Sequence, residues 1–171
     1  MIDEAKHALS AVQALRTDLG QHYVPPDNGV KADGMNLVPS ALFGKTRGYL
    51  EKIANQANGA YSQGWYDASA VMVRRLMETL IIEAFEKHNI ADRIKSPTGD
   101  FFYLRDLIDR TVSEKSWNLS RNTKAAMPRL KDVGDKSAHS RRFNAVRDDL
   151  ESLKNDLRVV TEELLVLAGL R

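Results

Sequence analysis

The chain has 171 residues, of which 43% are hydrophobic and 28% are charged, a composition typical of one globular domain and unlike that of a collagen or a disordered chain. It contains no cysteine, which excludes disulfides, thiolate metal sites and a cysteine nucleophile. The net charge is only +2, but residues 120–147 hold eight Lys and Arg against two Asp, and residues 148–171 hold three basic residues against six acidic ones. A nearly neutral chain therefore contains one strongly basic segment.

Several kinds of protein and site have no support in the sequence. No apolar run is long enough for a membrane span, and the acidic N-terminus lacks the basic and then apolar pattern of a signal peptide. We therefore expect a cytoplasmic protein that does not bind membranes. Glycine-rich phosphate loops, His-Glu-x-x-His and Gly-x-Ser-x-Gly are also absent, so we expect no metal and no cofactor.

The N-terminal part divides into a helix and a turn-rich connection. An apolar stripe at spacings of three and four predicts an amphipathic helix, formed by Ile2, Ala5, Leu9, Val12, Leu15 and Leu19. Residues 20–39 then carry Pro25-Pro26, Asn28-Gly29 and Pro39, which are turn signals. Within a single domain overall, we therefore separate residues 1–39 from a helical bundle over residues 40–171.

The remaining chain shows helical periodicity almost throughout. Helices are predicted over residues 40–62, 65–87, 101–114, 121–138 and 145–168. Ser40 and Asn144 are the expected N-caps of the first and last of these, and Pro128 either kinks or restarts the fourth. No stretch alternates with period two. The predicted fold class is all-α, with five or six helices in an antiparallel up-and-down bundle.

Two segments carry more than periodicity. In the first, residues 66–81, the small residues Ala68, Ser69 and Ala70 allow another helix to approach closely. Further on, Arg74 lies four residues before Glu78, close enough to form an ion pair on one helix face. We interpret this pair as a structural contact at the edge of the bundle.

The second segment, residues 134–142, is the centre of the basic region. Gly134 relaxes the backbone near a helix end, and Asp135 either caps a helix or orients an imidazole. One interpretation is a phosphate or RNA site, in which arginines bind phosphates and His139 transfers a proton. The alternative is that His139 packs at a helix end and the arginines are simply solvated.

These two segments, in this order and about 60 residues apart, resemble the HEPN superfamily (higher eukaryotes and prokaryotes nucleotide-binding). The likeness is to a bacterial branch that has an Ala-rich helix with Arg-x-x-x-Glu, here Arg74 to Glu78. A Gly-Asn-x-Ala-Ala-His stretch follows in that branch, here Gly134 to His139, and then a long final helix. The resemblance covers about residues 60–168.

The resemblance implies a small antiparallel helical bundle, usually a homodimer. Many members are metal-independent ribonucleases of toxin or antiphage systems, and others are inactive binding or accessory domains. The ribonucleases pair an arginine, which stabilises phosphate charge, with a histidine a few residues later, at a site shared across the dimer. Here the upstream cations are more distant, since nine residues separate Arg129 from His139 and seven separate Lys131 from it, and Asp135 replaces the usual Asn.

The leading hypothesis is a HEPN-like module that binds nucleic acid or protein without catalysis, in a mobile-element or defence context. Its expected phosphate contacts are Lys136, Arg141, Arg142 and Arg147, and its structural residues are Arg74, Glu78, Gly134 and Asp135. One alternative is a metal-independent endoribonuclease that uses His139 with Arg129 or Lys131. Another is a purely structural homodimeric interaction protein.

Overall fold

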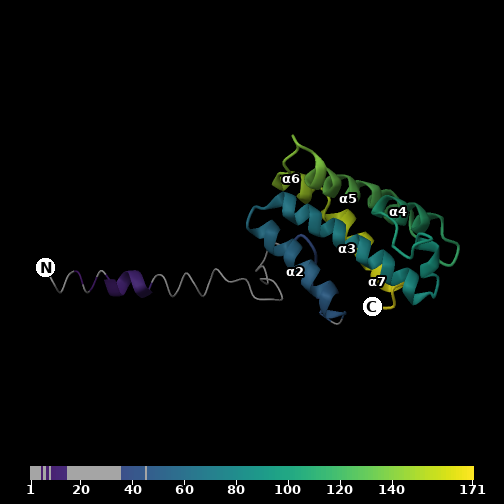
Figure 1. Cartoon of the computed structure of the whole chain (residues 1–171), viewed down its shortest axis with the longest axis horizontal. Coiled ribbons are helices and arrows are strands. Elements are labelled where there is room, and N and C mark those ends of the chain that lie inside the picture. Colours follow the sequence, from purple (N-terminus) through teal and green to yellow (C-terminus); the bar gives the residue numbers. More distant parts are fainter. Residues whose placement is uncertain (1–4, 6, 8, 15–35, 45) are drawn as a thin grey trace.

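The computed structural model describes residues 5, 7, 9–14, 36–44 and 46–171. In this part of the chain all regular elements are helices, and the only β-type pairing is an isolated bridge between Lys95 and Phe101. The all-α prediction is therefore confirmed. The elements after residue 36, shown in Figure 1, are η1 (Ser40–Leu42), α2 (Gly48–Ser62), α3 (Tyr66–Lys87), η2 (Ala91–Ile94), α4 (Leu104–Ser113), α5 (Arg121–His139), α6 (Arg147–Glu151) and α7 (Lys154–Leu167).

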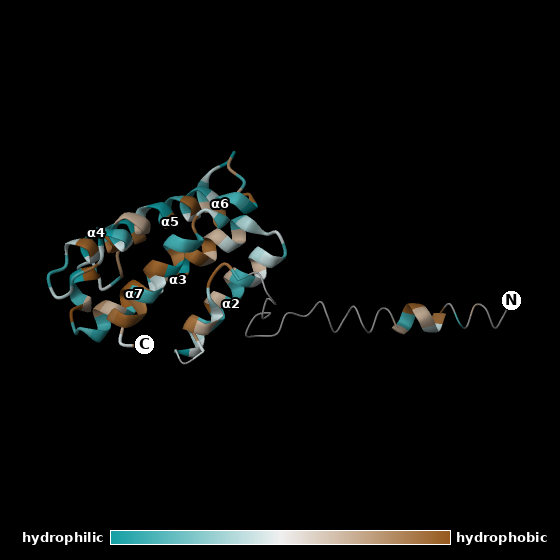
Figure 2. Cartoon of the chain, turned by 180° about the vertical axis from the view of Figure 1, so that it is seen from behind, coloured by the Kyte–Doolittle hydropathy of each residue, from teal (hydrophilic) through white to brown (hydrophobic). Residues whose placement is uncertain are grey.

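Helix α3 is the central element of the bundle, in contact with α2, α5 and α7. Its apolar positions recur at helical spacing, and Leu76 and Leu80 are buried, as the sequence predicts. Figure 2 shows hydrophobic colour on α3 and α7 and hydrophilic colour along much of α5. None of the helices in the described part of the chain is long and apolar enough to cross a lipid bilayer.

Helices α3 and α5 run antiparallel. Near the end of α3 the ring of Phe85 meets the edge of Trp117, which precedes α5. Near the start of α3, Ala70 and Arg74 lie against Gly134, which is close to the end of α5. The small residue Ala70 therefore faces α5. Its neighbour Ser69 faces α2, because the Ser69 hydroxyl donates to the Ala57 carbonyl of α2 at 2.8 Å.

A short segment before α2 is part of the packed body. Leu37, Val38 and Phe43 are buried against the core. The side chain of Asn58 on α2 accepts from the Val38 N–H and donates to the Val38 carbonyl, both at 2.8 Å. The core therefore includes two residues that precede residue 40.

Two predicted helices are divided in the structure. Over residues 40–62 the chain forms η1 and then begins α2 at Gly48 rather than at Ser40. The last helix is divided into α6 and α7, and its N-cap is Val146 rather than Asn144. The Ser152 hydroxyl donates to the Asp149 carbonyl at 2.9 Å at this division, a local bond that competes with regular helix pairing.

The element bearing the basic segment is one helix. α5 continues through Pro128 without interruption, and Pro128 is exposed. Proline lacks an N–H, so one helical hydrogen bond is missing at this position. The prediction that Pro128 restarts the helix is therefore wrong.

The first predicted helix lies partly outside the described residues, as does most of the connection over residues 20–39. Residues 9–14 are helical. Leu9 and Val12, two members of the predicted apolar stripe, are exposed.

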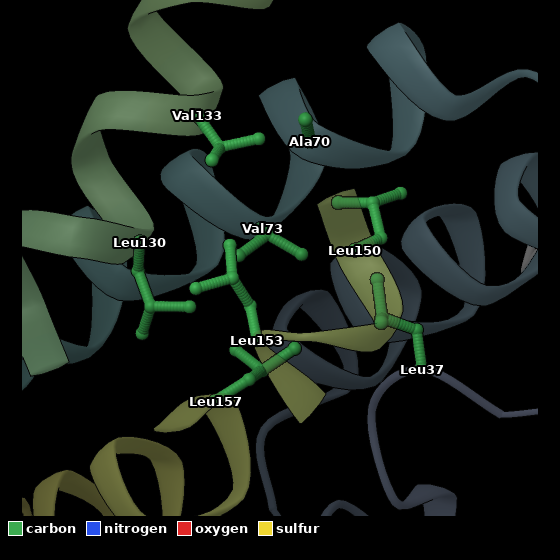
Figure 3. Close-up of a pocket in the computed structure, with 8 residues that line it drawn as sticks. All are labelled: Leu37, Ala70, Val73, Leu130, Val133, Leu150, Leu153 and Leu157. Carbon is green, nitrogen blue, oxygen red and sulfur yellow. The ribbon is translucent and has the colours of Figure 1, made fainter. Parts of the chain in front are cut away.

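One small apolar cavity lies where α3, α5, α6 and α7 meet (Figure 3). Its volume is about 10 Å³, close to the least that holds one water molecule. A water also needs polar partners, but the lining is entirely apolar: Leu37, Ala70, Val73, Leu130, Val133, Leu150, Leu153 and Leu157. The cavity is a packing defect of the core and offers no ligand site.

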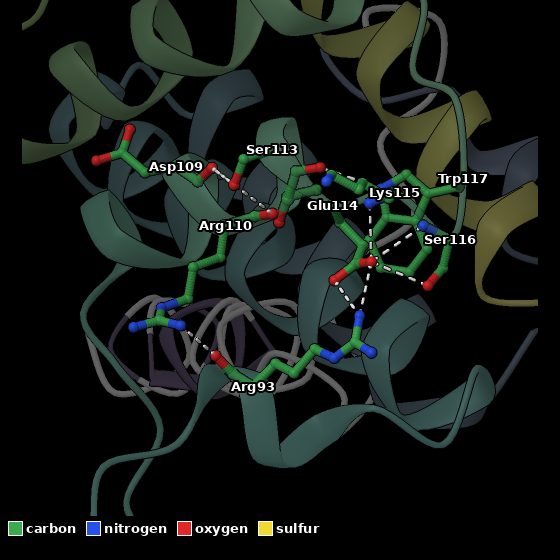
Figure 4. A network of polar contacts seen from close by, with 9 residues as sticks. Arg93, Asp109, Arg110, Ser113, Glu114, Lys115, Ser116 and Trp117 are labelled. Carbon is green, nitrogen blue, oxygen red and sulfur yellow. Dashed lines mark hydrogen bonds and ion pairs between the residues drawn. The ribbon is translucent and has the colours of Figure 1, made fainter.

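A polar network closes the end of α4 (Figure 4). The Arg93 guanidinium donates to both carboxylate oxygens of Glu114, at 2.8 and 2.9 Å. Glu114 also accepts from the backbone N–H of Lys115 and of Ser116, at 2.8 and 3.0 Å. The hydrogen bond from Arg93, against the opposing effect of burial and together with bonds from Ser116 and Lys115, lowers the pKa of Glu114 from 4.5 to about 2.

This lowered pKa predicts a loss of stability in acid. The ionised form of Glu114 is favoured in the folded state, so its contribution is complete above about pH 4.5 and is lost as the pH falls toward 2. Because 56% of the Arg93 side chain is exposed, we expect Arg93→Ala to lower the free energy of unfolding by only about 1 to 2 kcal/mol at pH 7. Urea unfolding of both proteins at pH 7 and pH 3 measures this, and the difference between them should shrink at pH 3.

Candidate nucleic-acid interface

The basic segment is carried by α5 and by the loop over residues 140–146, called here the α5–α6 loop. α5 begins where the Ser120 hydroxyl accepts from the Thr123 N–H at 3.2 Å, the expected chemistry of an N-cap. At the other end the Ser140 hydroxyl accepts from the Phe143 N–H at 3.2 Å. The Asp67 carboxylate of α3 then accepts from the Ala145 N–H at 2.9 Å. The loop therefore has an internal hydrogen bond near its start and a bond to α3 near its end.

The two segments singled out in the sequence lie against each other. Arg74 Nε lies 2.7 Å from Asp135 Oδ1, and Lys131 Nζ lies 2.5 Å from Asp135 Oδ2. Burial opposes charge on Asp135, but the hydrogen bonds from Lys131 and Arg74 outweigh it and lower the pKa of Asp135. Arg74 also pairs with Glu78 at 3.4 Å. Asp135 thus joins α3 to α5 and does not orient the imidazole of His139.

Gly134 enables this contact through its missing side chain. It is buried in the body of α5, and a Cβ built on it would lie 2.7 Å from Arg74 Cβ and 3.1 Å from the Ala70 carbonyl oxygen. Gly134 lies in regular helix, five residues before the end of α5, and not in the relaxed backbone that the sequence predicted. Gly134 instead allows α5 to approach α3 closely.

The cations nearest His139 in the proposed catalytic pattern are engaged elsewhere. Arg129 Nε lies 2.7 Å from Asp156 Oδ2 of α7, and Lys131 is bound to Asp135. At a rise of about 1.5 Å per residue, Lys131 lies about 12 Å and Arg129 about 15 Å from His139 along α5. Within one chain, the structure does not bring either cation next to His139, which is exposed at the end of the helix.

The predicted phosphate contacts fall into two groups. Lys136 pairs with Asp132 at 3.6 Å, and Arg147 Nε lies 3.4 Å from a carboxylate oxygen of Glu151. The side chains of Arg141 and Arg142 are exposed. Neither has an ion pair or side-chain hydrogen bond to any other residue that the structure describes.

The sequence prediction lacks three residues that lie at or near the candidate site. Asp67 holds the loop from 78 positions away, and Asp156 neutralises Arg129 from 27 positions away; no local pattern marks either residue. Trp65, at the turn into α3, is 67% exposed. Its signal is available in the sequence, since it follows Gly64 and lies outside the apolar stripe of α3.

Arg141 and Arg142 give the loop a defined chemical capacity. A guanidinium is permanently charged and presents a planar fork of N–H donors that matches phosphate oxygens. Neither guanidinium must first break an ion pair within the described part of the chain.

No family model, curated protein or solved structure shows significant similarity to the chain.

Proposed function

We propose that this protein is a non-catalytic nucleic-acid-binding module, and that the α5–α6 loop is its binding element. The observation that carries the proposal is the pair of exposed arginines, Arg141 and Arg142, which have no ion pair among the described residues. They lie on a loop that Asp67 attaches to α3. Arginines bind backbone phosphates, and each such contact releases bound counterions.

The engagement of the other cations supports a binding role over cleavage. A metal-independent ribonuclease of the kind the resemblance implies needs an arginine beside its histidine. Here the two candidate cations upstream of His139, Arg129 and Lys131, are neutralised by Asp156 and Asp135. Arg141 follows His139 in the chain and does not take the upstream position that the resemblance implies. The membership of the HEPN superfamily and the homodimer remain proposals that this binding role does not require.

We expect Arg141→Ala/Arg142→Ala to weaken binding of single-stranded RNA about tenfold or more at about 0.1 M salt, because two phosphate contacts are lost. The slope of log K against log salt concentration should fall in magnitude by about 1.4, that is about 0.7 for each lost contact. Fluorescence anisotropy of a labelled RNA, titrated at several salt concentrations, measures both quantities.

Arg121→Ala/Lys124→Ala is the matched control. It removes the same charge from the same basic segment, but at the opposite end of α5, where both side chains also lack an ion pair among the described residues. Equal losses in the two double variants would show binding by general charge and contradict the loop assignment. Metal-independent cleavage of the RNA that disappears in His139→Ala would favour the ribonuclease instead.

A further inference from the structure

Trp65 is a largely exposed tryptophan. It lies between α2 and α3, and 67% of its surface is exposed, whereas tryptophan is highly buried on average. The other tryptophan of the chain, Trp117, is half-buried with its ring edge against Phe85. Burial in the core therefore does not explain the large ring at position 65.

The backbone of Trp65 is fixed on both sides. Its N–H donates to the Ala60 carbonyl at 2.9 Å, and the Gly64 N–H donates to the Tyr61 carbonyl at 3.1 Å. Gly64 has a φ of 77°, and the two bonds form the usual glycine-containing end of a helix. The Trp65 carbonyl then accepts from the Ser69 N–H at 3.0 Å. A ligand that stacks on this ring therefore orders little additional chain.

Trp65 lies at the same end of the bundle as Arg141 and Arg142. Gly134 contacts Ala70 and Arg74, and the two helices are antiparallel. Because both rise by about 1.5 Å per residue, the end of α5 is level with the start of α3. Asp67, two residues after Trp65, holds the loop at Ala145. Figures 1 and 2 both show the α2–α3 turn and the α5–α6 loop at one end of the molecule.

We infer that Trp65 is a stacking platform for a base of a single-stranded nucleic acid whose phosphates bind Arg141 and Arg142. This inference rests on the proposed function and specifies the ligand class. An indole ring stacks on the face of any base, and neighbouring cations bind the strand's backbone. In a duplex those faces are covered by the neighbouring base pairs, so that Trp65 adds nothing to the binding of double strands.

The test is Trp65→Ala, measured with a labelled oligouridylate of about ten nucleotides. We expect affinity to fall about tenfold while the salt dependence stays as in the wild type, because no charge is removed. Trp65→Phe should retain part of the affinity. Tryptophan fluorescence should be quenched on binding in the wild type and much less in Trp65→Ala, where only Trp117 remains.

Two further ligands test whether the protein binds single-stranded nucleic acids as a class. An oligothymidylate of the same length should depend on Trp65 equally, because stacking does not involve the 2′-hydroxyl. An RNA duplex should bind the wild type and Trp65→Ala with equal affinity. Equal dependence on Trp65 for duplex and single strand contradicts stacking on an unpaired base.

Failure of the inference is distinguishable from failure of the proposed function. If Trp65→Ala binds the oligouridylate as tightly as the wild type while Arg141→Ala/Arg142→Ala binds more weakly, the platform is overturned and the binding loop stands. If the wild type binds no single strand, both are overturned.

Discussion

Asn58→Ala is expected to lower the free energy of unfolding by about 2 to 4 kcal/mol. Asn58 is 1% exposed and satisfies both polar groups of the Val38 peptide. Removing the amide leaves a buried N–H and a buried carbonyl without partners, and each costs about 1 to 3 kcal/mol. Chemical denaturation followed by circular dichroism measures the change at constant pH.

Gln56→Ala is the control for this variant. Gln56 is exposed on the same helix, so its replacement should change stability by less than about 0.5 kcal/mol. If Asn58→Ala were as stable as the control, the segment before α2 would be held by the apolar contacts of Leu37 and Val38 alone.

Gly134→Ala is expected to destabilise the protein by about 1 to 3 kcal/mol, although alanine is the better helix former. The new Cβ would lie 2.7 Å from Arg74 Cβ and 3.1 Å from the Ala70 carbonyl. The Arg74 Cβ is attached directly to the backbone of α3, and the Ala70 oxygen is part of that backbone. Neither atom can move away by a side-chain rotation, so the clash is relieved only if α3 and α5 move apart. Thermal unfolding should show a lower midpoint, and the ion pair between Arg74 and Asp135 should weaken with it.

Gly48→Ala tests the same substitution without the close contact. Gly48 is the first residue of α2, and nothing lies within 4 Å of a Cβ built on it. Alanine there should leave stability unchanged or raise it by up to about 1 kcal/mol. Stabilisation of similar size in both variants would mean that α5 does not need a glycine to approach α3.

The sequence predicts the features that depend on residues close together in the chain, and it does not predict those that depend on contacts between distant residues. The stripe that includes Leu76 and Leu80 is local, so helix α3 was predictable from spacing alone. The burial of the segment before α2 involves Val38 binding Asn58, twenty positions later, and no local pattern contains such a pair. Periodicity therefore predicts where helices form but not which distant residues they contact.

The candidate site shows the same division. The basic character of residues 120–147 was evident from the sequence, but which cations are available was not. Arg129 is neutralised by a carboxylate of α7, whereas Arg141 has no partner among the described residues. The packing of α5 against α7 brings Asp156 next to Arg129, and this packing cannot be read from the sequence of the basic segment.

The bond between Asp67 and Ala145 bears on which amino acids the α5–α6 loop can contain. Asp67 recognises a main-chain N–H, a group that every residue except proline supplies. The identities of residues 141–144 are therefore independent of this anchor. The same scaffold can exchange the side chains of these loop residues while the loop stays attached at Ala145 to the start of the central helix.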